Sequence, residues 1–245
     1  MGCDIHCHVE VRTEDGWQHV WPPLVAETED VEACPEEYVN FPGTIVSSYE
    51  EYQKVAAPWD HPLRIRRNYN LFAIFADVRN GIGFAGTKTG EGFNIIAEPR
   101  GIPDDASIET AWDIQYWEGD AHSHSWLTLK DLLDFDWDQT TSHVGVVSPR
   151  EFVHWKEHGV PSYWSADVSG LTVLEISNEE MEAHLASGGG STNEAGLFLY
   201  TTVTWESKYR DSVGSHFFDV TIHALKQLGD PEEAEDVRLV FFFDN

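Results

Sequence analysis

The sequence predicts an α+β fold, built as a single domain (residues 1–245) with a mixed or mainly antiparallel sheet, an N-terminal β-hairpin and packed helices. Three observations favour this class. A hairpin pattern opens the chain, a run of apolar residues at 237–243 predicts a final strand, and several helical patterns lie between them. We expect the hairpin and the final strand to belong to the same sheet.

The hairpin comes first along the chain. Residues 4–12 and 17–21 alternate polar and apolar side chains, and the turn residues Thr-Glu-Asp-Gly at 13–16 separate them. Residues 22–46 are rich in Pro and Glu and predict a flexible loop, which a short helix at 48–55 follows.

A buried helix is predicted next, because residues 68–79 are apolar nearly all round a helical wheel. The five glycines that follow, within residues 81–94, predict a flexible loop. They do not match a dinucleotide or phosphate-binding loop, because they follow a helix and the nearest lysine is displaced.

The second half of the chain alternates helices and strands. Capping residues and apolar periodicity predict helices at 108–117, 129–135, 149–157, 178–186 and 213–228, and β-prone runs predict strands at 171–176 and 197–205. The segment Ser-Gly-Gly-Gly-Ser-Thr-Asn predicts a flexible loop near 187–195.

Composition limits the function classes. The net charge is −28, from 43 acidic and 15 basic residues, which excludes extended binding to nucleic acid but leaves room for a small anionic ligand. No apolar run approaches the roughly 20 residues of a membrane span. Three cysteines and the lack of a leader pattern predict a cytoplasmic, reduced protein. The sequence does not indicate an oligomeric state.

Two His-x-His strings predict a metal site. Alternation along a strand puts Asp4, His6 and His8 on one face, and His122 with His124 supplies a second pair. These five groups could hold a divalent metal, zinc or else manganese. Two alternatives stay open: a chain with 12 histidines forms some close pairs by chance, and a histidine-lined pocket could act as acid and base without metal.

Rare arginines predict an anion site. Arg66 and Arg67 precede a predicted helix, whose first N–H groups favour a phosphate or carboxylate, and Arg100 lies in a stiff turn between two prolines. A surface role explains them as well.

Further candidates complete the expected site. Trp126 is expected to form a wall of the pocket, beside the second histidine pair. Glu206, near a strand end, and Asp4 are the candidates for catalysis, although a salt bridge also explains Glu206. Asp244, at the end of the last strand, could be a further metal ligand.

Two resemblances bear on function. The opening D-I-H-x-H resembles the first-strand metal motif of the amidohydrolase and PHP phosphoesterase superfamilies, which implies that His6 and His8 are ligands in metal-assisted hydrolysis. The hairpin that follows does not fit the barrel of those families. The chain as a whole resembles a group of uncharacterised bacteriophage proteins, which implies expression inside an infected bacterium. That resemblance is carried by residues 4–10 (DIHCHVE), 67–73 (RNYNLFA), 99–103 (PRGIP), 122–129 (HSHSWLTL) and 243–245 (FDN).

The leading prediction is therefore a metal-dependent hydrolase that acts on a small phosphorylated or nucleotide-like substrate. Its rival is a non-catalytic phage accessory protein that sequesters a small molecule or blocks a host protein, for which a strongly acidic surface is also suitable.

Overall fold

The computed structural model describes residues 2–21, 62–117, 119–229 and 231–244 of the chain. Within them the α+β class, the mainly antiparallel strand pairing and the N-terminal hairpin are confirmed. The strands form two sheets, where the sequence led us to expect one. The loop predicted at 22–46 and the helix predicted at 48–55 lie outside the described residues.

Contacts within the chain gather into two compact units. Unit 1 consists of Met1–Asn68, Ile95–Phe135 and Gly214–Asn245, and unit 2 of Tyr69–Asn94 and Asp136–Val213. Each unit contains one of the two sheets.

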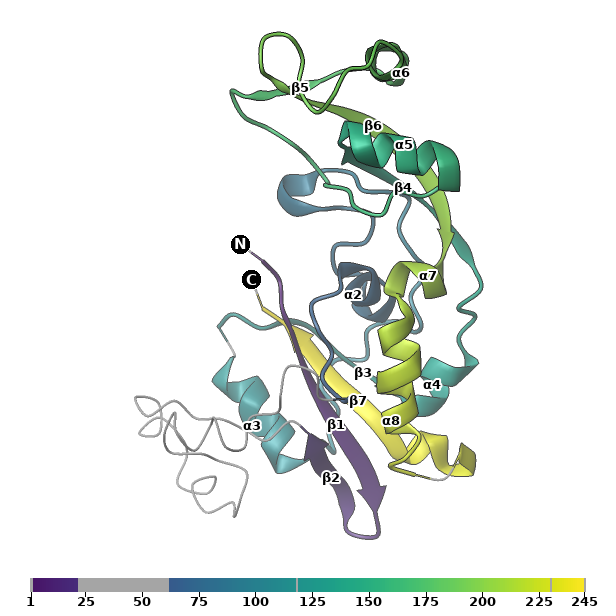
Figure 1. Ribbon diagram of the computed structural model, residues 1–245. Coiled ribbons are helices and arrows are strands. Elements are labelled where there is room, and N and C mark those ends of the chain that lie inside the picture. Colours follow the sequence, from purple (N-terminus) through teal and green to yellow (C-terminus); the bar gives the residue numbers. More distant parts are fainter. Residues whose placement is uncertain (1, 22–61, 118, 230, 245) are drawn as a thin grey trace, which may run out of the picture. The chain divides into compact units, whose positions relative to one another are not determined.

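The sheet of unit 1 joins the two ends of the chain. Its strand order is β2-β1-β7-β3, with every neighbouring pair antiparallel, and its strands are β1 (Ile5–Thr13), β2 (Gly16–Trp21), β7 (Val237–Phe243) and β3 (His122–Thr128). β7 lies between β1 and β3 (Figure 1), and all its residues are buried. The hairpin and the final strand therefore share a sheet, as predicted.

The hairpin turns between Thr13 and Gly16, where a strand pair closes around two turn residues. Gly16 has a φ of 107°, which a residue with a Cβ rarely adopts. From the turn to Glu10 the register is regular and places His19 opposite Glu10, and it shifts only beyond this pair, between Glu10 and Val9. Because residues opposite each other share a face, His19 lies on the polar face of β1.

Helices α3 (Ile108–Tyr116) and α4 (Leu129–Asp134) begin where their caps predict. The Ser107 hydroxyl accepts from the N–H of Thr110, and Thr128 and Asp131 form a reciprocal capping box.

The predicted helix at 213–228 is wrong in its first turn. Helix α7 (Tyr209–Val213) of unit 2 ends there, because Gly214 takes a φ of 88° and breaks the helical path. A new helical segment in unit 1 follows, containing the π-helix η3 (Phe217–Ile222) and α8 (His223–Leu225). The 3-10 helix η4 (Pro231–Asp236) then leads into β7.

Unit 2 has a three-stranded sheet of order β4-β6-β5. β6 (Phe198–Lys208) pairs antiparallel with β4 (Thr140–Val147) and parallel with β5 (Val173–Glu175). Helices α5 (Pro149–His158) and α6 (Asn178–Ala186) pack on one face through a core of Val147, Phe152, Met181, Leu199, Val203 and Trp205 (Figure 1). The sequence analysis missed β4, whose Thr, Ser and Gly weaken its strand pattern.

The other elements of unit 2 are helix α2 (Tyr69–Ala76), which is buried as predicted, and the short 3-10 helix η2 (Phe84–Gly86). The glycine-rich segment after α2 hydrogen-bonds to β4, because Glu91 donates to the carbonyl of Ser142 and Val144 donates to that of Thr89. Flexibility in the segments 81–94 and 187–195 stays a prediction. Among the described residues, no helix has both the length and the apolar character to cross a bilayer.

Candidate functional site

The polar face of β1 is the feature of unit 1 in which titratable side chains gather. His6 pairs in register with Phe242, His8 with Val240 and Glu10 with Arg238, so alternation places these three β1 side chains on one face. Both histidines stack on Phe242, with ring centroids 4.6 Å away for His6 and 6.4 Å for His8. The shared face of His6 and His8 is therefore as predicted.

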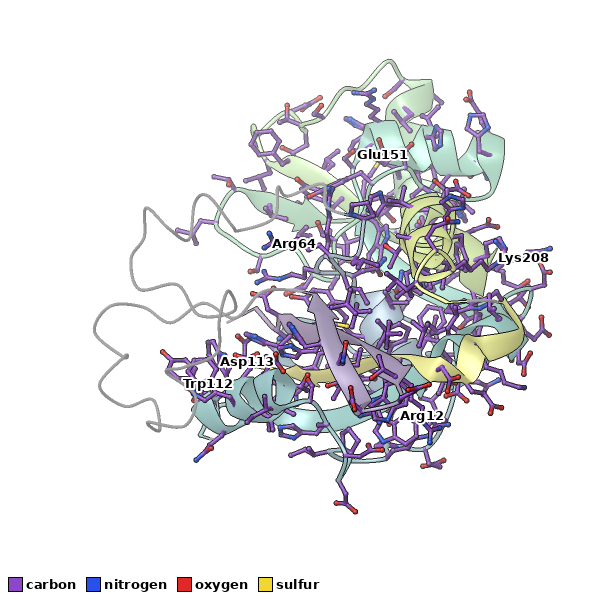
Figure 2. The ribbon with its side chains drawn as sticks, turned by 90° about the horizontal axis from the view of Figure 1, so that it is seen from below. Arg12, Arg64, Trp112, Asp113, Glu151 and Lys208 are labelled. Atoms are coloured by element: carbon purple, nitrogen blue, oxygen red, sulfur yellow. The ribbon has the colours of Figure 1, made fainter. Side chains whose placement is uncertain are left out.

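A hydrogen-bonded chain runs from α3 through β1 to β2. The Nε2 atom of His8 lies 2.8 Å from Oδ2 of Asp113, and its Nδ1 atom lies 3.0 Å from Nε2 of His19. The side chain of His8 is only 2% exposed, and that of Asp113 is 16% exposed. Asp113 projects from α3 (Figure 2). Both ring nitrogens of His8 are thus committed to partners.

Asp113, the carboxylate at one end of the hydrogen-bonded chain, determines which ring nitrogen of each histidine carries a proton. Ionised Asp113 can only accept, so His8 donates through Nε2. A neutral His8 then accepts at Nδ1 from the Nε2–H of His19, which leaves the lone pair of His19 on Nδ1. No described residue hydrogen-bonds that Nδ1 atom. The chain therefore ends on a ring nitrogen that can accept a proton.

Burial lowers the pKa of His19 to about 4, although the carboxylates of Glu10 and Asp113 oppose this shift. At neutral pH His19 is therefore uncharged, with its lone pair available. Protonated His19 would be a stronger acid than an ordinary imidazolium, and neutral His19 is a correspondingly weaker base.

A buried ion pair fixes β1 against the start of α3. Glu10 and Arg238 have side chains 0% and 2% exposed, and Nε of Arg238 lies 2.8 Å from Oε2 of Glu10. The hydroxyls of Ser107 and Thr110 donate to the other oxygen of Glu10. Nη1 of Arg238 also donates to Asp105 at 2.8 Å.

The energetic balance of this pair follows from its hydrogen bonds. Burial alone would raise the pKa of Glu10, but the hydrogen bonds from Ser107, Thr110 and Arg238 outweigh it and hold that pKa below its usual range. No local sequence pattern joins Glu10 to Arg238, so this pair could not be predicted from the sequence.

Each remaining candidate at the start of β1 has a partner within the chain. Arg67 donates two hydrogen bonds to the carboxylate of Asp4, which hold the pKa of Asp4 below its usual range. Asp244 accepts from the backbone N–H of Asp4 at 3.0 Å, and its other oxygen lies 3.1 Å from Nε2 of His6. Asp244 thus ties the last residues of the chain to the first, and the two ends lie side by side (Figure 1).

The second histidine pair does not share a face. Ser123 has a φ of 51°, and the pairing of β3 with β7 shifts register between His122 and Ser125. His122 stacks on Phe243 and His124 on Phe242, and these neighbours point to opposite sides of β7. The bulge at Ser123 therefore turns the two side chains apart, and the expectation that both bind one metal ion stays a prediction.

Three further residues were expected to bind the anion, Arg66 and Arg100, or to act as the base, Glu206. Arg100 donates to both carboxylate oxygens of Asp131 and to the carbonyl of Trp126, and its guanidinium lies 4.5 Å from the centre of the Trp126 ring. Arg66 is exposed in the segment before α2. Glu206 is exposed on β6, in unit 2, whereas the histidine chain belongs to unit 1.

No group of three His, Cys, Asp or Glu side chains is placed to hold one metal ion within the part of the chain that the structure describes. The Asp4, His6, His8, His122 and His124 set is divided among Arg67, Asp244, Asp113, His19 and two sides of β7. Metal binding by this set stays a prediction.

Unit 2 contains a second histidine cluster. Nε2 of His143 lies 2.9 Å from the hydroxyl of Ser207 and 3.1 Å from that of Ser212, the two hydroxyls are 2.6 Å apart, and Ser212 donates to the carbonyl of Lys208. All four contacts are satisfied if His143 donates to both serines and Ser207 donates to Ser212. In this arrangement His143 takes no proton from a serine, so the cluster is a structural link rather than a nucleophile with its base.

No protein-family model, curated protein or solved structure matches the chain. The chemistry of the site is therefore argued from its geometry. The hairpin pattern could have brought His19 close to His8, since the predicted turn nearly fixes their register. No sequence signal indicated Asp113, which comes from a helix more than a hundred residues further on.

Proposed function

We propose that the protein is a hydrolase that uses histidine acid–base chemistry, with His19 as the proton-accepting group. The observation that carries this proposal is the hydrogen-bonded chain from Asp113 through His8 to His19. A histidine whose second nitrogen is held by another group has a fixed tautomer and a fixed ring orientation, which general base catalysis requires.

The role of each residue follows from its place in the hydrogen-bonded chain of Asp113, His8 and His19. His19 takes a proton from water or from a substrate hydroxyl at Nδ1 and returns it to the leaving group. His8 and Asp113 are positioning residues: they orient His19, and the negative charge of Asp113 stabilises the imidazolium that forms. No proton needs to reach Asp113.

The substrate class that we propose is a small phosphorylated or nucleotide-like anion. Arg67 has a side chain that remains 49% exposed beside Asp4, and an anion could compete with that carboxylate for the guanidinium. Asp4 is six positions before Glu10, the partner of His19, so an anion held at Arg67 would lie roughly 20 Å along β1 from the proposed base. The net charge of −28 disfavours a long polyanion but not a small one held locally.

A panel of phosphomonoesters, phosphodiesters and nucleotides, assayed in EDTA, tests the proposal. We expect turnover that falls at least ~100-fold in His19→Gln, in line with general acid–base contributions. His216→Gln, which changes an exposed histidine, is the matched control and should retain turnover. Activity that disappears in EDTA and returns with zinc or manganese would favour metal-dependent hydrolysis instead.

One observation favours the rival function, a binding protein without catalysis. Arg67, Arg100 and His6 all have acidic partners within the chain, as expected of groups that stabilise a fold. If no substrate of the panel turns over, while a basic host protein or a small molecule binds in the micromolar range, the binding function replaces the hydrolase.

A further inference from the structure

Helix α5 presents two histidines one turn apart. It begins at Pro149, after Ser148, whose side chain accepts from the N–H of Glu151, and it ends at His158 before Gly159, which has a φ of 80°. Residues four apart lie on the same side of a helix. His154 and His158 accordingly have ring centroids 4.2 Å apart, with an angle of 47° between the ring planes.

The opposite side of the helix is anchored. Phe152 belongs to the core of unit 2, and the indole Nε1 of Trp155 donates to the carbonyl of Thr204 on β6 at 3.1 Å. These contacts hold the helix in one orientation on the sheet. The histidines extend from a fixed backbone, so little order has to be gained when a ligand bridges them.

The spacing suits one transition metal ion. Nitrogen ligands of zinc lie about 2.1 Å from the ion, so two imidazoles that share it in adjacent positions have ring centroids roughly 4.5–5 Å apart. The observed 4.2 Å requires only a small rotation, for which the side chain of His158, 55% exposed, leaves room on its solvent side.

The charge around the pair favours a cation. A carboxylate oxygen of Glu157 lies 3.9 Å from Nε2 of His158, and the carboxylate of Glu151 interacts electrostatically with His154. Glu151, which Figure 2 labels, also accepts from the backbone N–H groups of Ser162 and Tyr163, so it adds negative charge while its position is fixed.

We propose that His154 and His158 bind one divalent transition metal ion, such as Zn²⁺, Ni²⁺ or Cu²⁺. No third His, Cys, Asp or Glu ligand converges on the pair among the described residues, so water completes the coordination and leaves exchangeable positions. Imidazole ligands select these ions over Mg²⁺ and Ca²⁺. This site is separate from the histidine chain of the proposed hydrolase and does not depend on it.

Isothermal titration of the full chain with ZnCl₂ at pH 7.5 tests the site. We expect about one equivalent bound with a micromolar Kd, at least tenfold weaker binding in His154→Gln and in His158→Gln, and little further loss in the double variant because the two ligands share one ion. Titration with MgCl₂ should show no binding at this site.

Two controls make the outcome specific. His216→Gln should bind zinc like the wild type, and so should His8→Gln, which tests whether the metal instead occupies the polar face of β1. Unchanged zinc affinity in both α5 variants, or loss only in His8→Gln, would overturn the proposal. Circular dichroism of each variant shows whether it is folded, so a lost signal cannot arise from unfolding alone.

Discussion

Asp113 accepts a hydrogen bond from His8 at 2.8 Å, although 105 positions separate the two residues along the chain. This contact joins helix α3 to the first strand, and through His8 it also fixes His19 on the second strand. The three residues thus lie where α3, β1 and β2 meet. The positions of their protons determine whether Nδ1 of His19 can accept a proton.

We predict that Asp113→Asn destabilises the protein by about 1.5–3 kcal/mol, the range for loss of a hydrogen bond to a charged group. The amide has nearly the same shape, so the loss reports the charge rather than a cavity. Urea unfolding at pH 7 measures it. Asp120→Asn, at an exposed position shortly after α3, is the control and should change the unfolding free energy by less than about 0.5 kcal/mol.

Replacing Arg238 by Met is expected to cost about 3–5 kcal/mol, because the carboxylate of Glu10 then remains buried without its partner. Adding Glu10→Gln should recover part of that loss, since it removes the unpaired charge. Arg12→Met on the same sheet breaks an exposed pair with Asp236 and should cost no more than about 1 kcal/mol. Equal costs for the two arginines would contradict the burial argument.

The low pKa of His19 predicts a pH-dependent stability. Its folded pKa of about 4 lies below the ordinary histidine value of 6.5, so the unfolded chain binds the proton more tightly. The contribution of neutral His19 to the free energy of unfolding is present above pH 6.5. It falls as the pH drops towards 4 and is fully lost below that. Between pH 7 and pH 5 we expect a loss of about 2 kcal/mol.

His19→Gln should remove that part of the slope, while His216→Gln should not. His124 and His143 also have lowered pKa values, caused mainly by burial, and they add slopes of the same sign. Urea unfolding of the wild type and of His19→Gln at pH 7 and pH 5 isolates the contribution of His19 to the pH dependence of stability. A slope that the substitution leaves unchanged would rule out His19 as its source.

Local patterns predicted the local structure well. The Thr-Glu-Asp-Gly turn predicted the hairpin, and the capping pair Thr128 and Asp131 predicted the start of α4, because both depend on residues close in sequence. Alternation also placed His6 and His8 on one face. These features depend on backbone geometry over a few residues.

The candidate site was harder to predict, because its partners come from distant elements and from irregular backbone. His19 follows the regular register of the hairpin, which places it opposite Glu10, but the positive φ of Ser123 separates His122 from His124. Strict alternation does not describe the backbone at Ser123. Asp113, Arg238 and Asp244 became partners of β1 only through the tertiary fold.

The most direct test of the central claim is a pH titration of the imidazole nitrogens by ¹H–¹⁵N NMR. It reports both the tautomer and the pKa of each histidine. We expect that His19 carries its proton on Nε2, keeps Nδ1 unprotonated at pH 7 and titrates near pH 4, and that Asp113→Asn alters the signals of His8 and His19 together. A His19 ring protonated on Nδ1 at pH 7, or one that titrates near the ordinary histidine value of 6.5, would rule out His19 as the proton acceptor described above.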